Sequence, residues 1–297
     1  MKRAFLAAAA LAWMMAGDAK AQAPSTDIFL APIKRIHDSI VVGPATNITH
    51  RPGYDNQPSF LPNSRGILYT VVGADAQADI WRYDIGARRS TQVTHTAESE
   101  YSATVMPGGL RMSVIRVEAD SAQRLWSFAL DGSNPQLLLT ALKPVGYHAW
   151  LSPSRLLTFV LGTPATMHLI DSDGGKDEIR ARDIGRALQR IPGRDAFSYT
   201  QRDSAKALWI TAQSVSGESD TMLMPAPPDN EYHAWTPDAV LLSVTGGKLV
   251  RWNGALDATR AWLPVADLSP AGARNISRLA VSPDGKWLAF VGEPASP

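Results

Sequence analysis

Two copies of the tetrapeptide Tyr-His-Ala-Trp, at residues 147–150 and 232–235, hold the residues whose type and spacing could do chemistry. An imidazole can transfer a proton or bind a metal, and two of them near the mouth of one channel could share a ligand. Neither copy has a His-x-x-x-His spacing or a nearby glutamate to complete a metal site. Histidines are often half-buried and hydrogen-bonded without a reaction to perform. The pattern therefore favours a structural role for His148 and His233 and leaves the paired-imidazole interpretation open.

Other reactive patterns are weak. The stretch Asp-Ser-Asp-Gly-Gly-Lys-Asp-Glu at 171–178 lacks the twelve-residue spacing and closing glutamate of a calcium loop, so a hairpin turn is expected there. There is no Gly-x-Ser-x-Gly elbow and no phosphate-binding glycine loop. These absences argue against a serine hydrolase of that type and against a nucleotide-binding enzyme.

The elements that must position these residues are revealed by a repeat. A short strand, a proline, a turn and an apolar strand recur six times, and the intervals between successive prolines are 45, 46, 39, 45 and 46 residues. Four strands need about 40–50 residues, so this period predicts six four-stranded antiparallel blades of an all-β propeller. We expect each proline to close the innermost strand of its blade, where no ladder donor is needed. The marker prolines are Pro62, Pro107, Pro153, Pro192, Pro237 and Pro283.

The two ends of the chain each supply half a repeat. The sixth unit stops after two strands, while residues 27–50 resemble the second half of a unit. We expect residues 27–50 to pair with 276–291 in one composite blade, which would leave no open edge. The two copies of the tetrapeptide are 85 residues apart, or two blades, and occupy the first strands of blades three and five. Trp150 and Trp235 are expected in the core.

The first 21 residues differ from the rest. Lys2 and Arg3 precede an uncharged run from Ala4 to Gly17, and Ala19-Lys20-Ala21 fits a signal-peptidase site, so residues 1–21 are predicted to be a signal peptide and 22–297 the propeller. Its removal changes the formal charge from +1 (29 − 28) to −1 (26 − 27). Such a balance excludes an electrostatic footprint for nucleic acid, and we expect an exported monomer, periplasmic or secreted, that does not insert into a membrane. The chain has no cysteine, which excludes disulfides and a lipid anchor on cysteine.

Two segments, Asn-Ile-Thr-His-Arg-Pro-Gly-Tyr-Asp-Asn-Gln-Pro-Ser-Phe-Leu-Pro at 47–62 and Val-Ser-Pro-Asp-Gly-Lys-Trp-Leu-Ala-Phe-Val at 281–291, resemble the propeller repeat of the TolB-like family. The match spans essentially the whole mature chain. It implies the propeller fold and is weak for function, because this fold serves many roles. TolB itself has an α/β domain before its propeller. Here the first blade-like strand starts near Asp27, so a stand-alone propeller is expected.

Loops that precede each first strand meet around one end of the channel, and loops on a rigid scaffold often carry function. The predicted function is therefore non-catalytic binding or scaffolding of a protein or small envelope-derived ligand. The alternative is a metal-dependent lactonase-like or sugar-processing enzyme. No cofactor is predicted, although a divalent metal at the channel end fits that alternative. The predicted ligand-binding residues are Asn56, Glu100, Tyr147, His148, Glu231, Tyr232, His233 and Arg278.

Overall fold

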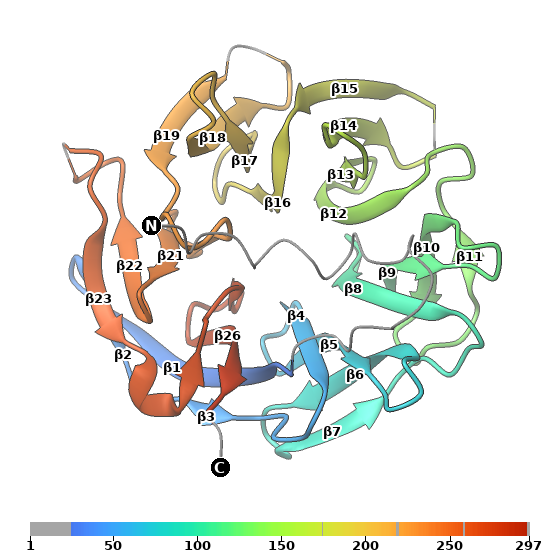
Figure 1. Ribbon diagram of the computed structural model, residues 1–297, viewed down its shortest axis with the longest axis horizontal. Coiled ribbons are helices and arrows are strands. Elements are labelled where there is room, and N and C mark those ends of the chain that lie inside the picture. Colours follow the sequence, from blue (N-terminus) through green and yellow to red (C-terminus); the bar gives the residue numbers. More distant parts are fainter. Residues whose placement is uncertain (1–24, 174, 218–219, 258, 296–297) are drawn as a thin grey trace, which may run out of the picture.

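Six four-stranded antiparallel blades form a closed ring in the computed structural model (Figure 1). The model describes residues 25–295 apart from 174, 218–219 and 258, so the predicted signal peptide lies outside the described residues. From the axis outward, the first five blades are β4–β7, β8–β11, β12–β15, β16–β19 and β20–β23. Their strands are β4 (Tyr54–Phe60), β5 (Gly66–Val72), β6 (Ala78–Asp84), β7 (Arg89–Gln92), β8 (Ser99–Val105), β9 (Arg111–Val117), β10 (Gln123–Ala129), β11 (Gln136–Leu137), β12 (Val145–Ser152), β13 (Arg155–Val160), β14 (Thr166–Asp171), β15 (Asp177–Arg182), β16 (Ile184–Arg190), β17 (Ala196–Arg202), β18 (Leu208–Ser214), β19 (Thr221–Pro225), β20 (Ala234–Trp235), β21 (Leu241–Thr245), β22 (Lys248–Trp252) and β23 (Leu263–Asp267).

The sixth blade joins both ends of the described chain, as predicted. Its inner strands are β25 (Leu279–Val281) and β26 (Trp287–Pro294), and β1 (Asp27–Ile36) continues the sheet outward. The register of β1 on β26 runs from Asp27 opposite Gly292 to Pro32 opposite Trp287. The outer positions are taken by β2 (Ser39–Val42) and β3 (Thr46–Asn47), and β24 (Ala273–Arg274) pairs with the end of β26. This composite blade closes the ring, so the propeller has no open blade edge at the junction of its ends.

Burial along the strands follows from packing between blades. The second strands are almost wholly buried, as in β5, because both faces of a blade meet a neighbouring blade. The outermost strands alternate between exposed and half-buried residues, as in β7, because they lie at the rim. The only helix in the described chain is the short 3₁₀ turn Ser269–Ala271, and none there is long and apolar enough to cross a membrane.

The marker prolines lie where the repeat predicts, in the turn after each innermost strand. Five of them come two residues beyond the last residue of β4, β8, β16, β20 and β25, and Pro153 directly follows β12. The missing N–H of each proline is therefore outside the ladder and costs no sheet hydrogen bond.

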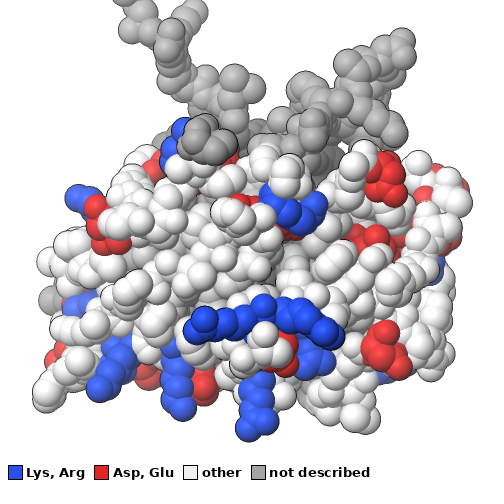
Figure 2. Space-filling view, turned by 90° about the horizontal axis from the view of Figure 1, so that it is seen from below, with Lys and Arg blue, Asp and Glu red and all other residues white. Residues whose placement is uncertain are grey.

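Charged side chains are spread over the outside of the ring. In the side view of Figure 2, basic groups gather along the lower edge, interspersed with acidic ones. Exposed pairs such as Arg35 with Asp238, at 3.3 Å, contribute little to stability because water screens them.

Candidate functional site in the central channel

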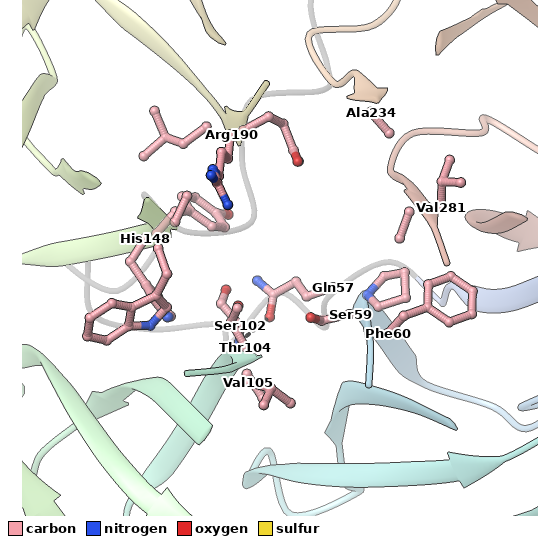
Figure 3. Close-up of a pocket in the computed structure, with 18 of the residues that line it drawn as sticks. Gln57, Ser59, Phe60, Ser102, Thr104, Val105, His148, Arg190, Ala234 and Val281 are labelled. Carbon is pink, nitrogen blue, oxygen red and sulfur yellow. Dashed lines mark hydrogen bonds between the residues drawn. The ribbon is translucent and has the colours of Figure 1, made fainter. Parts of the chain in front are cut away.

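The innermost strands of all six blades surround a channel cavity of about 800 Å³ (Figure 3). This volume is in the range of small-molecule sites. The described lining includes three arginines, Arg186, Arg190 and Arg278, and it includes no aspartate or glutamate. The remaining lining is largely apolar or uncharged. The cavity therefore has a positive, not a negative, electrostatic character.

The two Tyr-His-Ala-Trp copies form two equivalent contacts between blades, which we call the interblade clamps. In the first clamp, Ser113 Oγ of β9 lies 2.6 Å from His148 Nε2 and accepts a 2.9 Å hydrogen bond from Trp150 Nε1. In the second clamp, Ser198 Oγ of β17 lies 2.8 Å from His233 Nε2 and accepts a 2.8 Å bond from Trp235 Nε1. Histidine and tryptophan are two residues apart, so they leave the strand on the same face and reach one serine of the preceding blade.

Hydrogen-bond geometry in the first clamp fixes the roles of its atoms. The Ser113 hydroxyl also donates to the Thr104 carbonyl at 3.3 Å, so His148 Nε2 is the donor to Ser113 Oγ. Nδ1 of His148 is then a bare lone pair, buried without a partner, as is Nδ1 of His233. Burial lowers the pKa of His148 to about 4 and that of His233 to about 3. Both imidazoles are therefore neutral at physiological pH.

A serine beside a histidine could be a nucleophile, but these pairs lack what that chemistry needs. Ser113 and Ser198 are each 0% exposed, so no substrate can reach their hydroxyls. The imidazoles have no carboxylate on Nδ1 to orient them and to stabilise a positive charge. The clamps therefore have a structural role between neighbouring blades.

A second group of residues lies where the innermost strands begin, and we call it the tyrosine–arginine cluster: Tyr54, Tyr147, Arg186, Tyr232 and Arg278. Arg278 Nη2 donates to the Tyr147 hydroxyl at 2.9 Å. The guanidinium of Arg278 also lies over two aromatic rings, 4.2 Å from the Tyr232 centroid and 5.0 Å from that of Tyr147. Arg278 belongs to the sixth blade and Tyr147 to the third, so this contact connects opposite sides of the ring.

The hydroxyls of Tyr54 and Tyr232 are neutral, since desolvation by burial raises the pKa of each well above the usual value. Within the described residues, one carboxylate, that of Glu231, pairs with an arginine of the cluster. Glu231 lies 3.7 Å from Arg186 Nη1 and accepts the Arg186 backbone N–H at 3.2 Å. A Cβ at Gly185 would lie 2.7 Å from Glu231 Oε2, so glycine there allows this approach. Two guanidinium groups and one carboxylate give the cluster a formal charge of +1.

The structure brings together five of the predicted residues, namely Tyr147, His148, Tyr232, His233 and Arg278, all of which line the channel. Glu231 is outside the described lining and contacts Arg186, which does line the channel. Asn56 and Glu100 are outside the described lining. The Asn56 side chain is used in local bonds, accepting the Gln57 N–H at 2.7 Å. Whether any of these residues binds a ligand stays a prediction.

Glu100 is held in the wall between blades instead. Its Oε1 accepts a 2.5 Å bond from Thr96 and lies 3.3 Å from Arg116 Nε, while its Oε2 is buried without a partner. Desolvation by burial is the main cause that raises the pKa of Glu100 to about 7.

The list of predicted ligand-binding residues did not include Tyr54, Arg186 or Gln57, although Tyr54 and Arg186 belong to loops before first strands that the sequence marks as candidates. Register shifts between Asn56 and Ser59 in β4, and between Ile184 and Leu188 in β16, change which residues face the axis. Aromatic or basic residues near the start of several first strands were the available signal. Trp150 and Trp235, which were expected in the core, pack against the apolar clusters of the blades, but both are half-buried and also line the channel.

A metal centre would need several ligands aimed at one point. Within the described residues there is no group of three or more His, Asp or Glu side chains that could hold a metal ion. The two imidazoles nearest the cavity direct Nε2 toward serine hydroxyls. In the part of the chain that the structure describes, the channel wall therefore brings together no set of ligands suited to a divalent cation.

Comparison with known proteins identifies the fold and goes no further. No family model matches the sequence, and no curated protein matches it by sequence. Among solved structures, the TolB-type protein of Agrobacterium tumefaciens superposes with a TM-score of 0.67 at 14% identity, covering 91% of this chain and 98% of that one. TolB from Acinetobacter baumannii gives 0.55 at 11% identity, covering 90% of this chain and 64% of that one. The gluconolactonase XC5397 of Xanthomonas campestris gives 0.62 at 10% identity, covering 89% and 95%. The chain thus has the β-propeller fold of TolB-like proteins, and that fold is shared with an enzyme.

Proposed function

We propose that this protein is an exported, monomeric binding propeller that recognises a small envelope-derived ligand or a protein segment in its central channel, without catalysis and without a cofactor. The observation that carries the proposal is the composition of the channel wall. A cavity of about 800 Å³ is lined by aromatic, apolar and basic residues, whereas its serine–histidine pairs are sealed between blades. This wall can hold a ligand. Within the described residues, the lining hydroxyls of Ser59, Ser102 and Thr104 make no hydrogen bond to a histidine or a carboxylate, and no group of metal ligands comes together.

A blocked channel tests the proposal. Ser59 lines the cavity, is half-buried and makes its ladder contact with Leu68 through the backbone (Figure 3). Ser59→Trp should fill the cavity with little disturbance of the core, and Thr91→Trp on the exposed outer strand of the same blade is the matched control. In a thermal-shift screen of small organic acids, sugars and peptides, compounds that stabilise the wild type should lose their effect in Ser59→Trp and keep it in Thr91→Trp.

Unchanged stabilisation in Ser59→Trp would contradict the proposal, because binding would then lie outside the channel. If Ser59→Trp fails to fold, Thr104→Trp, which blocks the same cavity from the next blade, replaces it. Metal analysis of the purified mature protein tests the alternative. A stoichiometric divalent metal would favour the metal-dependent enzyme over the binding propeller.

A further inference from the structure

Arg278 is a half-buried cation with neutral partners. Within the described chain, its side chain makes the hydrogen bond to the Tyr147 hydroxyl and the contacts with two tyrosine rings, and no carboxylate oxygen lies within 4.0 Å of it. Charged groups withdrawn from water are usually paired with an opposite charge, because desolvation is costly. Cation–π contacts recover only about 0.5–2 kcal/mol each. The position therefore has unused capacity for an anion.

The nearby carboxylate does not fill this need. Glu231 is engaged by the side chain and the backbone of Arg186. The cluster keeps its formal charge of +1, which one monoanion would neutralise. A planar carboxylate also matches the two-pronged donor geometry of a guanidinium.

Gln57 adds an uncharged donor on the wall. Its Oε1 accepts bonds from Thr70 Oγ1 at 2.7 Å and from the Ser102 N–H at 2.9 Å. The carbonyl end is thus held against the wall, and the amide end extends into the cavity, as Figure 3 shows. Gln57 has φ of 59° and Ser102 has φ of 55°, a left-handed conformation that costs energy in residues other than glycine. Such strain is retained where the surroundings hold a side chain in a particular direction.

The opposite end of the channel carries aromatic and aliphatic side chains together with one exposed arginine, Arg190. Because the six innermost strands run the same way along the axis, their early residues gather at one end and their late residues at the other. Arg278 and Tyr147 are early, whereas Trp150, Trp235 and Val281 are late, and all line the cavity. The channel thus has Arg278 and tyrosine hydroxyls at one end, and aromatic surface beside Arg190 at the other.

We propose that the channel binds small organic monocarboxylates, with the carboxylate on the Arg278 guanidinium and an apolar body toward Trp150 and Trp235. This inference rests on the proposed function, because it names the ligand class of the same channel. Arg190 is exposed, so water screens its charge, whereas Arg278 is half-buried among neutral partners. This difference sets the direction of the ligand, with its carboxylate at Arg278 and its hydrocarbon toward the tryptophans.

Calorimetric titration with benzoate, benzyl alcohol and inorganic phosphate tests the inference on the full mature protein. Benzoate and benzyl alcohol have nearly the same shape and differ in charge. Benzoate should bind at least about tenfold more tightly than benzyl alcohol and phosphate, since a hydrogen bond to a charged group is worth about that factor. Arg278→Gln should weaken benzoate binding by about tenfold or more. The control Arg88→Gln removes an exposed guanidinium from a rim turn and should leave binding unchanged.

Several outcomes would overturn the inference. Benzoate affinity within about twofold of wild type in a folded Arg278→Gln would do so, as would equal affinity for benzyl alcohol or tighter binding of phosphate. Arg278→Lys keeps the charge and should retain part of the affinity, which separates loss of the cation from loss of the fold. No benzoate binding at up to roughly 10 mM would also reject the carboxylate.

The two proposals fail in different ways. If benzoate and benzyl alcohol bind equally and both are lost in Ser59→Trp, the channel function stands and the carboxylate inference falls. If benzoate still binds to Ser59→Trp but not to Arg278→Gln, the anion site is real but lies outside the blocked channel, and the proposed function falls.

Discussion

The interblade clamps and the tyrosine–arginine cluster are built from the same tetrapeptide, and they differ in how they treat charge. In each clamp the histidine and tryptophan meet a serine that is 0% exposed, and the imidazole is kept neutral. In the cluster the adjacent tyrosines surround Arg278, a cation for which the described chain provides only neutral partners. On one face of the repeated strand, histidine and tryptophan bond to the preceding blade, while the tyrosine that precedes them contacts Arg278.

This difference shows which titratable groups to associate with binding. Histidine was the obvious candidate by residue type, yet Nε2 of each histidine lies against a serine in the blade interface and Nδ1 is buried. At the axis, Arg278 has capacity for an anion that the described protein leaves unused. The interblade clamps should therefore affect stability, and the tyrosine–arginine cluster should affect binding.

Removing both clamp serines should have the largest effect. Ser113→Ala with Ser198→Ala leaves two indole N–H groups and two imidazole Nε2 atoms without partners in buried surroundings. Each unsatisfied group costs about 1–3 kcal/mol, and the sites are far apart, so we expect a loss of about 5 kcal/mol in the free energy of unfolding. Urea denaturation measures it. Benzoate affinity should stay unchanged at concentrations where the variant is folded.

Ser243→Ala is the matched control, because Ser243 is equally buried but bonds only the Tyr232 carbonyl, at 2.8 Å. It should cost about 1 kcal/mol. A double-serine loss no larger than that of the control would show that the clamps do not hold the blades together.

The clamp histidines should make the fold sensitive to acid. The pKa of His148 is lowered to about 4 and that of His233 to about 3 by burial, whereas an unfolded histidine titrates near 6.5. Below pH 6.5 the unfolded chain binds protons that the folded chain does not, so stability is complete above that pH and is lost as pH falls toward 4. By pH 5 the two sites together should cost about 3–4 kcal/mol relative to pH 8.

Comparison with His148→Gln/His233→Gln isolates this contribution from other titrating groups. The double variant should lose less stability between pH 8 and 5 than the wild type does. Parallel pH profiles for the two proteins would mean that the imidazoles become protonated in the folded state, and the description of the clamps as charge-free would be wrong.

Replacing Glu100 should have the smallest effect on stability. The pH dependence that Glu100 causes is opposite in sign to that of the two histidines. Because burial raises the pKa of Glu100 to about 7, the folded state disfavours the ionised form, and the stability present below pH 4.5 is lost as pH rises through 7. Glu100→Gln cannot ionise and should be about 2 kcal/mol more stable than wild type at pH 8, with little difference at pH 5. Thermal unfolding at the two pH values measures this difference. A destabilised variant at pH 8 would show that the ion pair with Arg116 outweighs the desolvation of the carboxylate.

The sequence by itself determined the blade number, the closure and the position of the turns. Each depends on local signals: a proline period, strand-length apolar runs, and half-repeats at residues 27–50 and 279–291. The sequence also placed Tyr147, Tyr232 and Arg278 near the start of their strands, which was sufficient to include them among the candidates.

Only the tertiary structure decided how these residues meet. Arg278 and Tyr147 are 131 residues apart and come from opposite blades, so no local pattern encodes their hydrogen bond. Register shifts in β4 and β16 alter the alternation that a regular strand would impose, which moves Gln57 and Arg186 to the channel wall while Asn56 stays outside its lining. The structural role of each clamp histidine depends on its hydrogen bond with a serine from the preceding blade. A closed ring fixes such contacts through the placement of whole blades, and for that reason a single strand's sequence cannot predict them.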